Sequence, residues 1–273
     1  MRLRPFLLPA LVLGLASCGS EPMHTATDDA RATAFSLTES DWLAIQEKRI
    51  LFGHQSVGQD ILAGVRTLAE GHPEVRLSIR RPGESGTTDG PGIVEMIVGE
   101  NGDPASKAAD FREALAAGLA GDHGIAMYKH CYLDVGQDTD PVKLFDEYRR
   151  SIEAIRAAHS HVTIAHVTIP LTSPDGAVKA LLKRVLRKST AVELNAKRNH
   201  FNRLLLEAYA ATDPVFDLAR LESTRADGSR VSVRRGGQTV YVLAPEYTDD
   251  GGHLNRAGQE RLATGFIAFL ARL

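Results

Sequence analysis

A serine near the start of this chain has the surroundings that a nucleophile needs. Ser56 ends the stretch Gly53-His54-Gln55-Ser56, which follows the apolar residues 49–52. A serine between the end of a strand and the start of a helix exposes its hydroxyl. The free N–H groups and positive dipole end of the helix favour a negative charge beside it. The alternative role of Ser56 is that of a helix N-cap, which serine also favours.

A histidine near the end of the chain has a carboxylate at the spacing that this chemistry requires. Asp250 and His253 are three residues apart around two glycines, just before an amphipathic segment. Such spacing lets the carboxylate hold one ring nitrogen while the other takes the proton of a serine hydroxyl. The alternative is a surface turn that merely precedes a helix cap. Asp249 and Asp134 are rival carboxylates for the orienting role.

Short apolar runs alternate with amphipathic segments from residue 41 onward, which predicts an α/β fold. The expected strands are residues 49–52, 75–79, 124–133, 162–169 and 215–218. The expected helices are one capped by Ser40 and the segments 57–68, 105–119, 141–158, 191–211 and 255–273, with a loop at 81–92. We therefore predict a three-layer α/β/α sandwich around a parallel sheet of about five strands. Ligands bind beyond the carboxyl ends of such strands, where Ser56 and His253 fall.

The two motifs together resemble those of the SGNH, or GDSL-like, hydrolase superfamily. Residues 249–263, DDGGHLNRAGQERLA, are similar to the closing block of that family, and the resemblance covers residues 49–273. It implies a flavodoxin-like fold and hydrolysis of esters, often of acetylated sugars or lipids, without a metal or other cofactor. It also implies Ser56 as nucleophile, His253 as general base and Asp250 as the carboxylate that orients it.

The sequence departs from this pattern in the groups that stabilise the oxyanion. The residue before Ser56 is Gln instead of Asp, and residues 129–134 contain no Asn where the family has one after its third strand. The resemblance implies an oxyanion hole made by the Ser56 N–H, by Gly86, and by Lys129 or Tyr132 in place of the Asn. Three further candidates remain open: Gly83, Gly90 and His130.

The N-terminus is similar to the signal peptide of a bacterial lipoprotein. Two arginines precede an apolar run at residues 6–15, which is shorter than the roughly 20 residues that cross a bilayer. The sequence Leu-Ala-Ser-Cys at residues 15–18 resembles a lipobox. We expect a signal peptide at residues 1–17, a lipid-anchored tether at 18–40 and a hydrolase domain at 41–273. Gly19 is typical of lipoproteins sent to the outer membrane, in a host that has one.

Composition limits the other functions. A net charge of −2 gives no indication of a nucleic-acid partner. The chain has only two cysteines, so lipidation of Cys18 leaves no intramolecular disulfide, and no histidine cluster has metal-ligand spacing. The basic, amphipathic stretch 179–188, KALLKRVLRK, is interpreted as a solvated helix face, with a phosphate-binding site as the alternative. Cys131 is expected to be a buried residue, with a nucleophilic role as the alternative, and His166 a hydrogen-bonded core histidine.

We predict a lipid-anchored serine esterase in the cell envelope. Its substrate is expected to be a small ester or an acetyl group, with an envelope or extracellular glycan as one carrier. The alternatives are a non-catalytic lipoprotein that binds polysaccharide in the same crevice, and a phospholipase-like enzyme.

Replacing Cys18 by Ala should leave the precursor uncleaved or release the protein from membranes, because the cysteine sulfur carries the lipid. Fractionation of cells and mass spectrometry of the mature N-terminus measure this. A Cys18→Ala protein that is processed and membrane-bound like wild type would contradict the prediction.

Overall fold

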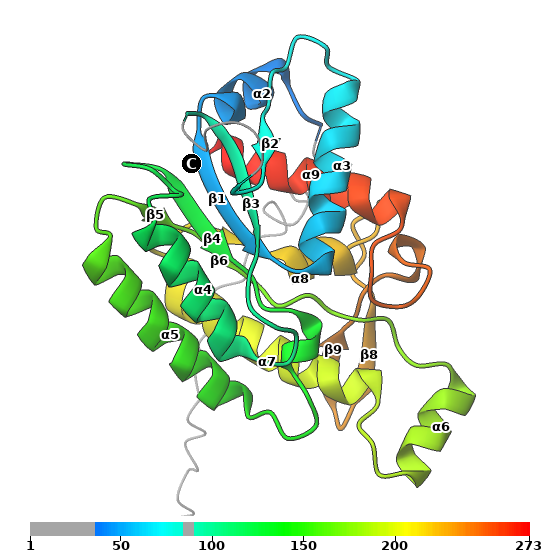
Figure 1. Ribbon diagram of the computed structural model, residues 1–273. Helices are drawn as coiled ribbons and strands as arrows, with labels where there is room; N and C mark the ends of the chain where they lie inside the picture. The colour runs from blue at the N-terminus through cyan, green and yellow to red at the C-terminus, as the bar shows by residue number, and fades with distance from the viewer. Residues whose placement is uncertain (1–35, 84–89) are drawn as a thin grey trace, which may run out of the picture.

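The computed structural model describes residues 36–83 and 90–273, and its centre is a five-stranded parallel sheet (Figure 1). The strand order is β2-β3-β1-β4-β5, and β1 lies in the middle. The bounds are β1 Arg49–His54, β2 Ile79–Arg80, β3 Gly92–Ile97, β4 Ile125–Tyr128 and β5 Thr163–Ile164. Leu51 of β1 lies in register with Val94 of β3 and Ala126 of β4. The predicted three-layer α/β/α fold with a parallel sheet is confirmed.

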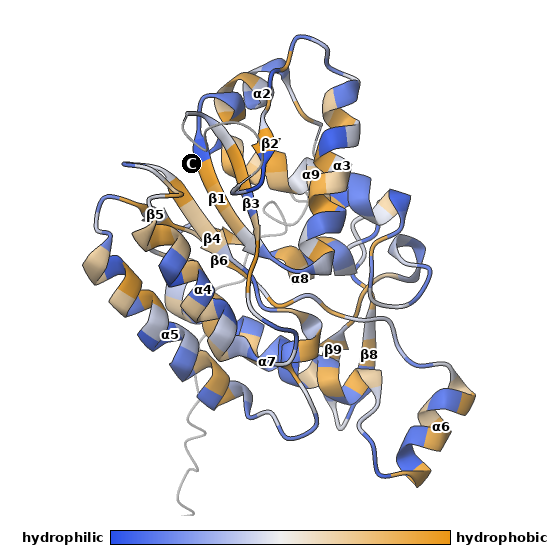
Figure 2. Ribbon diagram, in the orientation of Figure 1, coloured by the Kyte–Doolittle hydropathy of each residue, from blue (hydrophilic) through white to orange (hydrophobic). Residues whose placement is uncertain are grey.

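Helices cover both faces of the sheet, as the alternation of side chains along β1 requires. Ile50 and Phe52 point to one core, whereas Leu51 points to the other. The first core is covered by α2 (Glu39–Gln46), α3 (Ser56–Glu70), α8 (Leu218–Ser223) and α9 (Arg256–Ala271). The second is covered by α4 (Pro104–Ala116), α5 (Pro141–Ala158) and α7 (Ala191–Tyr209). Figure 2 shows the apolar strands β1 and β4 between these layers.

The remaining strands form two separate two-stranded sheets. β6 (His166–Val167) follows β5 after one residue and pairs in parallel with β7 (Val215–Phe216). β8 (Ser232–Arg235) and β9 (Gln238–Tyr241) form an antiparallel hairpin beside α7. α6 (Ala177–Val185) extends away from the body of the molecule (Figure 1). Two short 3₁₀ helices, Tyr132–Asp134 and Pro245–Tyr247, complete the fold.

Three predictions of local structure were wrong in an informative way. The neighbour of β1 is β3, which the sequence reading left unassigned, whereas the expected strand 75–79 contributes only the two-residue β2. Glu95 interrupts the apolar pattern of β3, yet it is buried between Arg66 and Arg81. The first helix is capped by Thr38 in a capping box, and not by Ser40.

Two helices from opposite ends of the chain pack directly together. Gly64 of α3 lies against the backbone of α9, where a β-carbon would come within 2.3 Å of the Gln259 carbonyl oxygen. Glycine therefore permits a short distance between α3 and α9, which any larger residue would increase. α3 begins at the carboxyl end of β1, and α9 follows the segment that holds His253, so this contact brings the two predicted motifs to one edge of the sheet.

Within residues 36–83 and 90–273, no helix combines the length and apolar character needed to span a bilayer.

Candidate active site

Ser56 and His253 meet at the carboxyl edge of the sheet. The His253 Nε2 lies 3.1 Å from the Ser56 Oγ, although 197 positions separate the two residues. The two motifs that the sequence analysis placed beyond the strand ends thus lie side by side. Both groups are open to solvent, since Ser56 is half-buried and the His253 side chain is 46% exposed. A hydrogen bond of this length is within the range for proton transfer from a hydroxyl to an imidazole.

Asp250 holds the other nitrogen of the His253 ring. Its Oδ2 lies 2.6 Å from Nδ1, while its Oδ1 accepts the backbone N–H groups of Gly252 and His253, each at 2.8 Å. The hydrogen bond with His253 and these N–H groups hold the pKa of Asp250 well below its usual range. Asp250 is therefore ionised at neutral pH and fixes the proton of His253 on Nδ1.

The two rival carboxylates lie elsewhere. Asp249 Oδ1 accepts a hydrogen bond from the Asn255 Nδ2 at 3.3 Å, so it faces the start of α9. Asp134 is buried and pairs with Lys107 at 2.8 Å. Of the three carboxylates considered, Asp250 alone contacts His253.

Ser56 is not the cap of its helix. The N-cap of α3 is Gln55, and Ser56 is the first helical residue. The Gln55 Nε2 donates to the Val98 and Gly99 carbonyl oxygens, at 2.7 and 2.6 Å, and ties this turn to the segment after β3. Because the first N–H groups of a helix have no intrahelical acceptor, the N–H of Ser56 is available to a ligand.

Asp60 connects the two halves of the site and was missed by the sequence reading. It lies one turn after Ser56 on α3, and its Oδ2 accepts the backbone N–H of Leu254 at 3.0 Å. Burial raises the pKa of this carboxyl above its usual value. The residue after His253 is thus bound to the helix that carries Ser56, which limits how far the histidine can move.

The structure does not place any of the three candidate glycines of the oxyanion hole beside Ser56. Gly86 lies outside the described residues. Gly83 and Gly90 belong to the connection after β2, which β3 separates from β1. The glycine that lies next to the Ser56 turn is Gly99, after β3, but its N–H donates to Asp110 Oδ2 at 2.7 Å.

Among the expected side-chain donors, Tyr132 lies at the site. Its ring stands edge-on to that of His253, with centroids 6.1 Å apart. A β-carbon at Gly252 would lie 3.0 Å from its hydroxyl oxygen, so the hydroxyl reaches the loop that carries His253. Lys129 is fully buried, with its Nζ 3.5 Å from the His130 carbonyl oxygen, and the ring of His130 packs among buried aromatic side chains. The geometry does not support Lys129 or His130 as an oxyanion donor.

Arg198 of α7 fixes the position of Tyr132. Its Nε and Nη2 donate to the Tyr132 carbonyl oxygen at 3.1 and 2.9 Å, and its Nη1 donates to Asn195 Oδ1 at 2.7 Å. Arg198 is buried, which is a position that arginine occupies only with such partners. The basic character of residues 191–211 gave no sign of this role, because the partner is a carbonyl oxygen from a distant loop.

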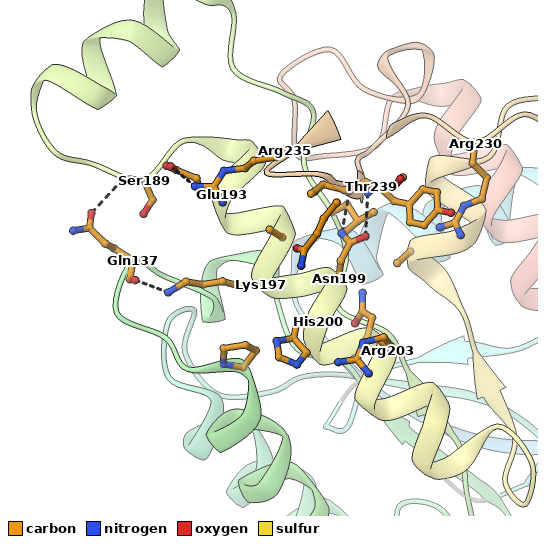
Figure 3. Close-up of a pocket in the computed structure, with 18 of the residues that line it drawn as sticks. Gln137, Ser189, Glu193, Lys197, Asn199, His200, Arg203, Arg230, Arg235 and Thr239 are labelled. Atoms are coloured by element: carbon orange, nitrogen blue, oxygen red, sulfur yellow. Dashed lines mark hydrogen bonds and ion pairs between the residues drawn. The ribbon is translucent and has the colours of Figure 1, made fainter. Parts of the chain in front are cut away.

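A cleft of about 610 Å³ adjoins the site. Its lining includes Tyr132, Asp250 and Gly252 as well as Lys179 and Lys183, whereas Ser56 and His253 lie outside it. A larger cavity of about 1160 Å³ lies between α7, the β8–β9 hairpin and the end of α6 (Figure 3). It includes none of Ser56, Asp250 and His253. Figure 3 shows two of its cations already bound, Arg235 to Glu193 and Lys197 to Gln137.

Other potentially reactive or polar side chains have structural roles. Cys131 is fully buried, so its sulfur does not face the opening. His166 is a core histidine, as predicted, with the Tyr148 hydroxyl 2.7 Å from its Nδ1. Asn202 closes two hydrogen bonds with the backbone of Ile169. No cluster of metal-ligating side chains occurs among the residues that the structure describes.

Comparison with known proteins bears on the fold. No protein-family model and no characterised protein sequence matches this chain. A GDSL-like lipase from Parabacteroides merdae is similar in structure, with a TM-score of 0.50 and 13% identity over 82% of this chain and 96% of the other. A carbohydrate acetylesterase from Sinorhizobium meliloti gives a TM-score of 0.47 and 11% identity over 82% and 99%. At 13% identity, the likeness to the Parabacteroides protein concerns the arrangement of helices and strands.

A buried carboxylate lies below the site. Glu222 of α8 is almost fully buried and accepts the backbone N–H of Leu171. Burial raises its pKa to about 8, against the opposing effects of that N–H and of the charges of Lys129 and Arg198. The folded state therefore favours the protonated form, whose contribution to stability is present below the usual pKa and is lost as the pH rises through about 8.

Replacing Glu222 by Gln should stabilise the protein increasingly as the pH rises from 5 to 9, because Gln stays neutral and keeps the acceptor for Leu171. A difference of 2 kcal/mol corresponds to roughly 4–8 °C in Tm for a domain of this size. Thermal unfolding across this pH range measures the difference between variant and wild type. Glu207→Gln, at an exposed position, is the matched control and should give no such trend. A Tm difference that is constant with pH would refute the prediction.

Proposed function

We propose that this protein is a serine esterase of the SGNH, or GDSL-like, type. The proposal depends on one observation: Ser56, His253 and Asp250 form a continuous chain of hydrogen bonds of 3.1 and 2.6 Å at the carboxyl edge of the sheet. A hydroxyl, an imidazole and an ionised carboxylate in this order are the groups that acyl transfer requires. The GDSL-like fold and the two sequence motifs support the same activity.

In the first half of the reaction, the Ser56 Oγ attacks the carbonyl carbon of the ester while His253 Nε2 takes the hydroxyl proton. Asp250 stabilises the imidazolium that forms. The tetrahedral intermediate then collapses, the bond to the alkoxy oxygen breaks, and His253 returns the proton to the leaving alcohol. The product of this half is an acyl group on Ser56.

In the second half, water replaces the alcohol. His253 Nε2 takes one proton of the water while its oxygen attacks the acyl carbon, and the Ser56 Oγ leaves and recovers the proton. One ester and one water thus give one acid and one alcohol. The exposure of His253 and Ser56 gives water access to this step.

The oxyanion needs donors that point at the place where charge develops. We assign the N–H of Ser56 at the start of α3 and the hydroxyl of Tyr132, which Arg198 holds against the His253 loop. The positive end of α3 adds to this stabilisation. A tyrosine hydroxyl in the place of the family's asparagine amide preserves the hydrogen bond that the chemistry requires.

The substrate that we propose is an ester or acetyl group carried by an envelope or extracellular glycan. The exposed charged side chains of Lys179 and Asp249 line the adjoining cleft, which favours a polar carrier. We further propose that lipid on Cys18 anchors the protein on the outer side of the membrane. That part of the proposal has its support in the residues around Cys18 alone.

Replacing Ser56 by Ala should abolish hydrolysis of p-nitrophenyl acetate, with a loss in kcat of roughly 10⁴-fold or more, because the nucleophile is gone. Release of nitrophenolate by the purified protein measures it. Ser40→Ala, on α2, is the matched control and should keep wild-type activity. Activity untouched by Ser56→Ala would overturn the esterase proposal and leave a polysaccharide-binding lipoprotein as the better interpretation.

Replacing Asp250 by Asn should lower kcat by up to about 10⁴-fold with little change in KM, because the imidazole loses its orienting carboxylate and adopts the wrong tautomer. Asn keeps an oxygen acceptor for the N–H groups of Gly252 and His253, so the loop should survive. Asp249→Asn is the matched control, since Asp249 contacts Asn255 and not His253. Steady-state kinetics and circular dichroism of both variants decide the assignment. Equal losses in the two would show that Asp250 has no special role.

A further inference from the structure

The helix α6 turns its apolar side to solvent. Val178, Leu181, Leu182 and Val185 recur at the spacing of one helical stripe, and with Leu186 they are 55% to 83% exposed. These five are half of the ten large apolar side chains exposed in the described part of the chain. None of the α6 side chains is buried. The stripe that a surface helix normally packs against its own core is therefore unpartnered.

Two lysines attach α6 to the body of the protein. The Lys183 Nζ lies 2.9 Å from both carboxylate oxygens of Asp175, and the Lys179 Nζ lies 3.4 Å from Oδ1. The same carboxylate accepts the N–H of Ala191, the first residue of α7, at 2.6 Å. Asp175 is buried, so one carboxylate binds the helix and the start of the next helix together. Four of the five basic residues in 179–188 are exposed, as expected of a solvated helix face, but the apolar face of the helix is exposed as well.

Basic residues flank the apolar stripe of α6. Residues 177–188 contain five basic residues and no acidic one. Helical spacing places Lys179 and Arg184 on either side of the apolar stripe, and Arg187 and Lys188 follow at the helix end. Figure 2 shows the blue and orange bands of this helix at the margin of the molecule. Aliphatic residues flanked by cations are the arrangement of helices that lie in the interface of a membrane with anionic lipids.

We propose that α6 docks the protein on an anionic lipid surface, with its apolar stripe in the headgroup–acyl boundary and its cations on the lipid phosphates. A second copy of the chain fits less well, because a nine-residue helix is roughly 13 Å long. Such a helix alone is too small for the about 800 Å² per partner that a stable protein interface buries. A bilayer needs no complementary shape.

Docking through α6 would also place the proposed active site near the lipid surface. Lys179 and Lys183 of α6 line the same cleft as Asp250 and Gly252. The mouth of this cleft would thus open beside the membrane. The docking itself does not depend on esterase activity, since the contacts that carry it involve neither Ser56 nor His253.

A fluorophore on α6 tests the docking directly. The full chain carrying Cys18→Ala and Val178→Cys is labelled with an environment-sensitive nitrobenzoxadiazole, because Cys131 is buried. Adding phosphatidylglycerol vesicles should shift the emission to the blue, and phosphatidylcholine vesicles at the same lipid concentration should not. The same label at Leu43→Cys on α2, where the native side chain is 48% exposed, is the matched reporter and should stay in water.

Adding Leu181→Asp to the labelled chain should weaken vesicle binding about 10-fold or more, since it places a negative charge in the apolar stripe. Arg184→Gln together with Lys188→Gln should weaken binding to phosphatidylglycerol and reduce its salt dependence. Hydrolysis of a soluble nitrophenyl ester should be unchanged by Leu181→Asp. An absence of turnover in every variant would therefore count against the esterase alone.

Two results would overturn the proposal. One is an unshifted label at position 178 with phosphatidylglycerol vesicles, or a shift of equal size with neutral vesicles. The other is a blue shift that grows with protein concentration in the absence of lipid, together with a dimer in sedimentation that Leu181→Asp dissolves. That result would assign the stripe to a second copy of the chain.

Discussion

The contact between α3 and α9 is the constraint on which the candidate site depends. Ser56 begins α3, and His253 stands just before α9, so the separation of the two helices sets the distance between hydroxyl and imidazole. Gly64 lets the helices approach until the Gln259 carbonyl occupies the space of a missing β-carbon. Asp60 adds a hydrogen bond to Leu254 close to the site itself. Packing therefore fixes a distance that neither motif controls alone.

Two kinds of polar environment meet around this contact. Ser56, His253 and Asp250 are open to water, where an ionised carboxylate and a mobile proton cost little free energy. Glu222, Lys129 and Arg198 are buried, and burial raises the pKa of Glu222. Arg198 has a second task, because it holds the Tyr132 loop through the backbone. The buried Arg198 thus supports the Tyr132 loop beside the open site.

Charged residues at the surface also differ in what they bind. Two arginines that line the large cavity beside α7 bind acidic residues of the same lining, Arg235 to Glu193 and Arg203 to Glu207. On α6, by contrast, Asp175 binds Lys183 and Lys179, while the apolar stripe is exposed on the described part of the chain.

The sequence by itself determined the elements whose signals are local. Apolar periodicity marked α5 at residues 141–158, and a strand–turn–helix pattern marked Ser56. The three-residue spacing of Asp250 and His253 within one loop is also local, so their contact followed from the chain alone. The alternation of strands and helices added the expectation that both motifs share one edge of a parallel sheet.

Tertiary structure decided what depends on distant partners. β3 was invisible because Glu95 breaks its apolar pattern, and the arginines that allow this carboxylate to be buried come from other elements. The N-cap of α3 is Gln55 and not Ser56, and the position of Gln55 depends on the carbonyl oxygens after β3 that its side chain binds. Tyr132 differs from Lys129 in burial, which depends on how the segment after β4 packs against other elements. The exposure of the apolar face of α6 could not be predicted, because a helical wheel shows which residues share a face but not which face meets the protein.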